Sequence, residues 1–121
     1  MSKTIPELVD EFARHIQAQT EAIARGDVAD SNRHADKYIA AWETLKEEYG
    51  DAGRDGLAVL FQHPRTDVRV SAAGMLLRHK TNEATCVLKK AAEDGDFAAE
   101  LTLEQWRDGT WELDPEPAPT H

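Results

Sequence analysis

Glycine and proline residues recur at helix-length intervals, and this punctuation most strongly limits what the chain can fold into. The breaks fall at Gly26, Gly50, Gly56, Pro64, Gly95 and Gly109. Between them apolar residues recur three or four positions apart, which is the spacing of one face of a helix. No run of four or more residues shows the clean alternation, rich in Val, Ile and Thr, that is typical of a strand. The sequence therefore predicts an all-α fold.

About six helices are expected, paired as three antiparallel hairpins. Only Gly26 and Asp27 separate the first two helices, so these must fold back on each other. Thr4 and Glu7 have the spacing of a capping box, which places the start of the first helix at Ile5. The expected helices span about 5–25, 28–49, 54–62, 66–79, 81–93 and 97–108.

Several large apolar side chains near the C-terminus are candidates for the core. Phe97, Leu101 and Trp106 are expected on the inner face of the last helix, and Trp111 follows that helix. Ile39 is similarly expected on the inner face of the second helix. The sequence leaves open whether Trp106 and Trp111 lie in the core or at an interface. An exposed tryptophan pair would mark an interface, and a buried pair would mark only the end cap of the fold.

The length of 121 residues predicts a single helical domain over residues 1–114. Residues 115–121, PEPAPTH, lack apolar side chains to bury and are expected to form a flexible tail. The N-terminus has no basic-then-apolar signal segment, and no apolar run approaches the ~20 residues that cross a bilayer. We therefore expect a cytoplasmic protein with no membrane partner.

The sequence favours no catalytic or metal-binding assignment. It carries no dinucleotide-binding fingerprint, phosphate-binding loop, nucleophile elbow or zinc-protease helix. The histidines at 15, 34, 63 and 79 include no pair with the helical spacing of metal ligands. Cys86 with His79 is the best available nucleophile pair, but a lone cysteine inside a helix usually behaves as a small hydrophobic residue. We therefore expect no enzyme activity, cofactor or metal.

Charge is the most informative functional signal. The formal net charge is -9 at pH 7, which disfavours general binding to nucleic acid. The charges are nevertheless segregated, since residues 62–92 carry six bases against two acids, and residues 93–116 carry nine acids against Arg107 alone. The candidate partner-binding residues are therefore the bases Arg65, Arg69, Arg78, Lys80, Lys89 and Lys90 and the acids Glu100, Glu104 and Asp108.

Two resemblances extend this interpretation. The segment LAVLFQHPRTDVRVSAAGMLL, residues 57–77, resembles a HEAT-like repeat unit, in which each helical hairpin buries its apolar face against the next one. The segments HPRTDVRVSAA, VLKKAAEDG and EQWRDG resemble a family of small bacterial proteins catalogued as a domain of unknown function (two-thousand-nineteen). The resemblance implies a short superhelix with a long N-terminal hairpin over 5–49 and HEAT-like hairpins over 54–109. It also implies that Asp67 and Arg69 join neighbouring hairpins through polar contacts.

Three functions are compatible with these features. The first is a non-catalytic protein–protein interaction module, of which one specific form is an immunity or antidote protein that neutralises a basic toxin. The alternative is a nucleic-acid-binding HEAT-like protein that uses the bases between residues 65 and 90. An enzyme built on His79 with Cys86, or on His63 with a carboxylate, is third. We favour the first, with an unidentified basic protein as partner and with the oligomeric state left open.

Overall fold

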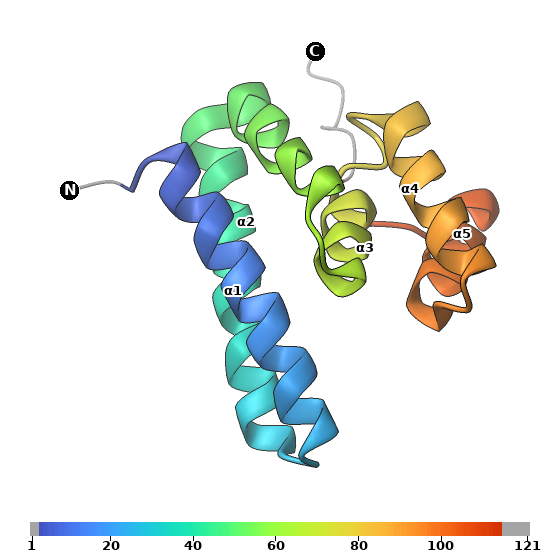
Figure 1. Ribbon diagram of the computed structural model, residues 1–121. Helices are drawn as coiled ribbons and strands as arrows, with labels where there is room; N and C mark the ends of the chain where they lie inside the picture. The colour runs from blue at the N-terminus through green and yellow to red at the C-terminus, as the bar shows by residue number, and fades with distance from the viewer. Residues whose placement is uncertain (1–2, 115–121) are drawn as a thin grey trace.

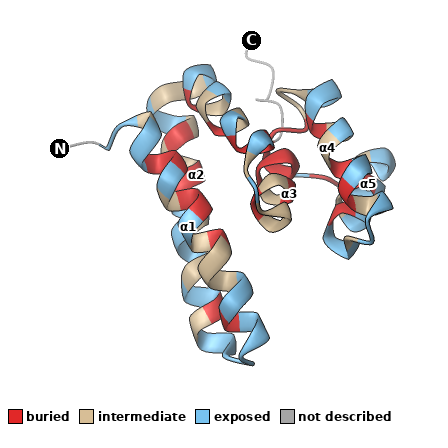
Figure 2. Cartoon of the chain, in the orientation of Figure 1, coloured by how far each residue is buried: buried red, intermediate tan, exposed pale blue. Residues whose placement is uncertain are grey.

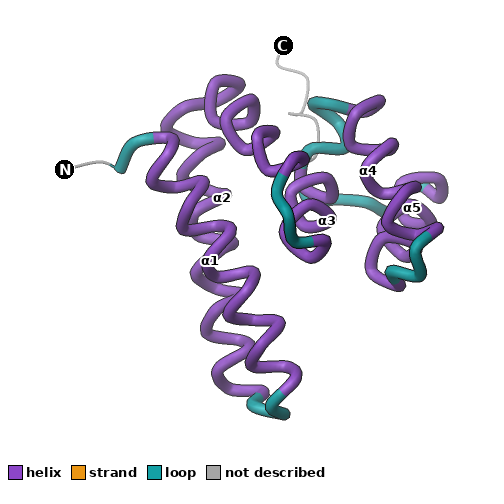
Figure 3. The backbone as a smooth tube through the Cα atoms, viewed as in Figure 1, coloured by secondary structure: helices purple, strands orange, loops and turns teal. Residues whose placement is uncertain are grey.

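The computed structural model describes residues 3–114, and helices account for most of them (Figure 1). Within these residues there are five α-helices and one short 3-10 helix, η1, joined by short loops (Figure 3). The all-α prediction is confirmed, and the expected tail at 115–121 lies outside the described residues. The elements are α1 (Ile5–Ala24), α2 (Val28–Leu57), η1 (Ala58–Gln62), α3 (Thr66–Met75), α4 (Thr81–Glu93) and α5 (Phe97–Asp108).

The hairpin of α1 and α2 is the longest feature of the molecule (Figure 1). Thr4 and Glu7 form the predicted capping box, in which each side chain bonds to the backbone N–H of the other residue. Apolar side chains on facing stripes of the two helices close the pair, with Phe12 and Leu45 fully buried. The ring of Phe12 also meets that of Tyr38 edge-on, with centroids 5.5 Å apart.

The break that the sequence predicted at Gly50 is present as a kink inside α2. Gly50 has φ 56° and ψ -130°, a non-helical backbone conformation that strongly favours glycine, and it separates two helical stretches of α2. Beyond the kink, a Cβ atom on Gly53 would collide with the carbonyl oxygen of Leu45, so the absence of a side chain permits the close approach. The helix predicted over 54–62 corresponds to the part of α2 beyond Gly50, which ends at Leu57, together with η1 over Ala58–Gln62.

Helix α3 is the centre of the second half of the molecule and packs against α1, η1, α4 and α5. Buried residues concentrate on it and on the loop that follows (Figure 2). It ends at Met75 rather than near His79, as the sequence predicted. The turn that follows allows both Leu76 and Leu77 to be fully buried, whereas adjacent residues of a helix point about 100° apart.

The segment after α5 returns across the domain and is fixed by side-chain contacts. The indole N–H of Trp111 donates to the carbonyl oxygen of Gly74 at 2.7 Å. Trp111 is buried and Trp106 is half-buried, with their rings edge-on at 5.2 Å between centroids. Of the two possibilities left open by the sequence, the pair therefore forms an end cap.

The phase of α5 differs from the sequence-based expectation. Phe97 is 74% exposed and Leu101 is 43% exposed, so their predicted burial was wrong. Ala99 and Leu103 face the core instead, because α5 packs against α4 and α3 through that side of the helix. Ile39 on α2 is also 42% exposed, so its predicted place on the inner face of that helix was wrong.

Within residues 3–114, no helix combines the length and the apolar character needed to cross a membrane.

Candidate interaction surfaces

Two of the six predicted basic residues are committed to the turn between η1 and α3. The guanidinium of Arg65 pairs with the carboxylate of Asp67 at 2.9 Å. Burial raises the pKa of Asp67, but hydrogen bonds from Arg65 and Thr20 outweigh burial and lower it overall. Arg69 donates to the carbonyl oxygen of His63 at 2.7 Å and to the hydroxyl of Thr66 at 2.9 Å. The hydrogen bond from Thr20 of α1 to Asp67 of α3, at 2.7 Å, also joins neighbouring helices.

Arg78 and Lys80 are held at the other end of α3. Arg78 donates to the backbone carbonyl of Asp114 at 2.6 Å and also lies 3.2 Å from its carboxylate. Lys80 lies 3.4 Å from the carboxylate of Asp55, which His79 approaches to 2.7 Å. These two bases therefore attach the C-terminal segment and the end of α2 to the centre of the fold.

Lys89 and Lys90 are different, because both project from the exposed face of α4. Neither makes an ion pair with any residue in the described part of the chain. The structure therefore does not bring the six predicted bases together as one free basic patch. Four of them contact other groups of the fold, and two remain available to a partner.

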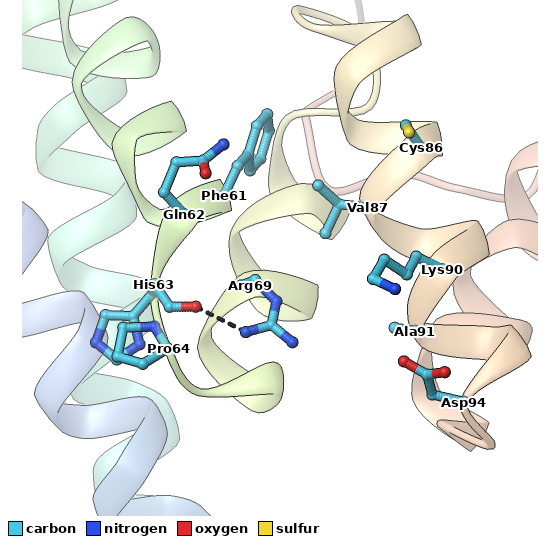
Figure 4. Close-up of a pocket in the computed structure, with 10 residues that line it drawn as sticks. All are labelled: Phe61, Gln62, His63, Pro64, Arg69, Cys86, Val87, Lys90, Ala91 and Asp94. Carbon is cyan, nitrogen blue, oxygen red and sulfur yellow. Dashed lines mark hydrogen bonds between the residues drawn. The ribbon is translucent and has the colours of Figure 1, made fainter.

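Arg69 and Lys90 line the same open groove between the η1–α3 turn and α4 (Figure 4). It encloses about 480 Å³ over a partly apolar floor that includes Phe61 and Val87. Figure 4 shows the guanidinium of Arg69 bonded to His63 on one side, with Lys90 and Asp94 on the facing helix α4. The groove combines two cations with one carboxylate, so its charge is mixed.

The three predicted acids lie exposed along α5. Glu100, Glu104 and Asp108 follow one another at intervals of four residues, so they stand on successive turns of the helix. No ion pair to any of them is found between residues 3 and 114. Because Phe97, Leu101, Glu104 and Asp108 recur at intervals of four, three and four residues, they share the outward face of α5. We call these four residues the outer α5 face.

The structure also brings together a histidine pair that the sequence analysis missed. His15 of α1 and His34 of α2 meet with their Nδ1 atoms 3.0 Å apart. Their ring centroids are 5.2 Å apart, so the rings meet nearly end to end and can share one proton between the two nitrogens. The signal was available, since the two residues lie on either side of the predicted hairpin turn at Gly26. Within the described residues, no group of three or more histidine, cysteine or acidic side chains is arranged to hold a metal ion.

The arginine–aspartate cluster at the C-terminal segment was also missed, and no spacing signal could have found it. Asp114 is buried, and Arg54 donates two hydrogen bonds to its carboxylate, of 2.7 and 3.1 Å. Burial raises the pKa of Asp114, but the hydrogen bonds and charges of Arg54 and Arg78 lower it overall. Arg54 and Asp114 are 60 positions apart in the sequence, so no local pattern could predict this contact.

Together these features define a small helical protein with exposed apolar and charged surfaces. The model of the family described as Domain of unknown function (DUF2019) matches residues 6–105, and the chain belongs to that family. The crystal structure of the protein RPA1889 from Rhodopseudomonas palustris CGA009 is similar, with a TM-score of 0.85 and 27% sequence identity. That similarity covers 95% of this chain and 96% of the other. No curated protein matches the chain.

Proposed function

We propose that the protein is a non-catalytic interaction module that binds a basic protein through the outer α5 face. The observation that carries this proposal is that one helix exposes apolar side chains together with carboxylates that make no ion pair within residues 3–114. Phe97 and Leu101 are 74% and 43% exposed, and Glu104 and Asp108 follow on the same face. A partner with an apolar contact flanked by lysine or arginine complements this pattern.

The charge of the whole chain supports the same partner chemistry. A net charge of -9 attracts a basic protein over several ångströms and speeds its encounter with the acidic surface. Burial of the Phe97 side chain would then supply affinity that does not depend on salt, since aromatic anchors often carry much of the binding energy of an interface. Electrostatic steering and an aromatic anchor are complementary contributions.

The resemblance to HEAT-like repeats suggests how a partner would pack on this face. In such a stack each hairpin covers its neighbour, and α5 is the last helix that the structure describes. A partner helix packed on the outer α5 face would take the place of a further hairpin. Within this proposal, an immunity or antidote protein against a basic toxin is the specific form that best fits the small, acidic chain.

Nucleic-acid binding receives less support from the same residues. Arg65, Arg69, Arg78 and Lys80 contact groups of the fold itself, which leaves Lys89 and Lys90 as the predicted bases free for phosphate. Two cations are few against a long-range field that repels polyanions. If this alternative holds, the protein will be retained on duplex DNA or RNA at ~50 mM salt in micromolar concentration.

The test is a comparative capture from the source lysate at low salt, after nuclease treatment, with three versions of the tagged protein. The first is the wild type, and the second carries Glu104→Lys and Asp108→Lys. The third carries Asp36→Lys and Glu47→Lys, two exposed acids of α2 that give the same change in net charge. We expect the wild type and the α2 control variant to capture one basic protein in stoichiometric amount, and the α5 variant to lose it. Equal recovery with all three would contradict the proposal.

A further inference from the structure

A second surface lies on the other side of α5, where α2, α3 and α5 enclose a groove of about 380 Å³. Its lining comes from all three helices and from the segment that follows α5. The groove is separate from the outer α5 face, because Ala98 and Thr102 line it while Phe97 and Leu101 point outward. Its principal apolar lining residues are Tyr38, Ile39, Trp42, Val70, Met75 and Leu113.

The groove combines exposed apolar side chains with small residues. Ile39 is 42% exposed and Leu113 is 47% exposed, and both line the groove beside the buried side chains of Trp42, Val70 and Met75. Ser71 and Ala98 also line the groove, and small side chains let the backbone of a partner approach closely. Apolar side chains left in water at the rim of a concavity are the usual mark of a docking site.

The wall formed by the C-terminal segment is fixed in place. Trp42 donates its indole N–H to the carbonyl oxygen of Leu113 at 3.4 Å, and Trp111 donates to Gly74 at 2.7 Å. Directly beyond Leu113, the two hydrogen bonds from Arg54 hold Asp114. The groove is therefore formed before any partner arrives, which reduces the entropy lost on binding.

The charged residues that line the groove are both acidic. Glu43 pairs with Lys46 at 3.3 Å, and Glu112 has no ion pair with any residue that the structure describes. A ligand that fills this groove therefore meets an apolar floor and an acidic rim.

We propose that the groove holds an amphipathic α-helix of the partner, with an apolar face toward Ile39 and Leu113 and a lysine or arginine near Glu112. This inference rests on the proposed function for the basic character of that partner. A helix suits a groove walled by helices, since apolar side chains three and four residues apart can reach the floor together. An extended peptide would find no strand edge to pair with in the described residues, which contain only helices and loops.

The probe is a fluorescein-labelled helical peptide of about 18 residues, or about 27 Å, built from leucine, alanine and lysine with one apolar face. Its binding is measured by fluorescence anisotropy against the full chain at low salt. The variants Ile39→Asp and Leu113→Asp each place a carboxylate in the groove. Val28→Asp is the matched control, because Val28 is 71% exposed at the start of α2 and does not line the groove. A peptide with glutamate in place of lysine tests the charge.

We expect the lysine peptide to bind, each groove variant to weaken it about tenfold or more, and Val28→Asp to leave it unchanged. The glutamate peptide should bind at least tenfold more weakly. Because an added aspartate attracts lysine, weaker binding to the groove variants cannot come from charge repulsion and indicates loss of the apolar contact. Thermal melts of each variant confirm that it remains folded.

Three results would overturn the inference. One is absence of binding by the lysine peptide, and another is binding that the groove variants leave intact. The third is a dimer of the free protein, seen by light scattering, that Ile39→Asp dissociates, because a second copy would then occupy the groove. The lysine peptide is also titrated against the Glu104→Lys, Asp108→Lys double variant. If this variant loses peptide binding while the groove variants keep it, the groove inference fails and the proposed function survives.

Discussion

Removing the carboxylate of Asp114 should destabilise the whole domain, although the residue lies at the end of the described chain. The side chain is 5% exposed and receives two hydrogen bonds from Arg54, whose own side chain is 16% exposed. Arg78 holds the same residue through its carboxylate and its backbone carbonyl. The Asp114→Ala variant would leave two guanidinium groups partly buried without this partner.

Breaking a buried ion pair by removing one member costs about 3–5 kcal/mol. Here we expect about 2 kcal/mol, because Arg54 keeps a contact with Asp51 at 3.2 Å and Arg78 is 27% exposed. For a domain of this size, that corresponds to a fall in Tm of roughly 6–10 °C. The assay is thermal and urea unfolding followed by circular dichroism.

The matched control is Asp10→Ala, which removes a pair with Arg14 whose side chains are 67% and 60% exposed. That variant should change stability by less than ~0.5 kcal/mol.

The pH dependence of unfolding is a second test of the contribution of Asp114. A lowered pKa of Asp114 means that its stabilisation is complete above the unfolded value near ~3.9 and is lost as the pH falls below it. A fall of less than ~2 °C for Asp114→Ala at neutral pH would refute the reasoning.

Three further predictions follow from other parts of the fold. Burial, and then the charges of His34 and Arg14, lower the pKa of His15, so the folded chain resists protonation there; urea melts should show stability falling as the pH drops below ~6.5, with a smaller slope in His15→Gln. Gly53→Ala should lower the urea midpoint by an amount equivalent to about 2 kcal/mol or more, because the added Cβ collides with the Leu45 carbonyl; an unchanged midpoint would show that the kink relaxes freely. Phe97→Ala should change stability by less than ~0.5 kcal/mol because the ring is 74% exposed, whereas a fall of several kcal/mol would mean that the ring is in the core.

The elements with strong local signals could be predicted from the sequence. The capping box at Thr4 and Glu7, the turn at Gly26 and the C-terminal glycine at Gly109 all mark helix ends through contacts within a few residues. The break at Gly50 was also predicted, and its positive φ interrupts the helical conformation inside α2. The close approach of Gly53 to the Leu45 carbonyl across this kink could not be predicted from local spacing.

Two features could be known only from the tertiary structure: which side of α5 faces the core, and which of the predicted basic residues contact other groups of the fold. Phe97 and Ala99 are both apolar, and periodicity alone does not say which of them faces the core. Arg78 could not be recognised as structural, because its partner Asp114 lies 36 residues away. The exposure of the α5 acids needs no tertiary information, because ionised carboxylates are rarely buried without a partner, and they are exposed in the structure.

The most direct test of the proposed function is the affinity of the captured basic protein for Phe97→Ala, measured by titration calorimetry at two salt concentrations. The ring is exposed in the free protein, so its removal should leave the fold intact while it weakens binding. We predict a rise in Kd of about tenfold or more at both salt concentrations, because an apolar contact is not screened. An unchanged Kd for a folded Phe97→Ala variant would contradict the assignment of the outer α5 face as the binding surface.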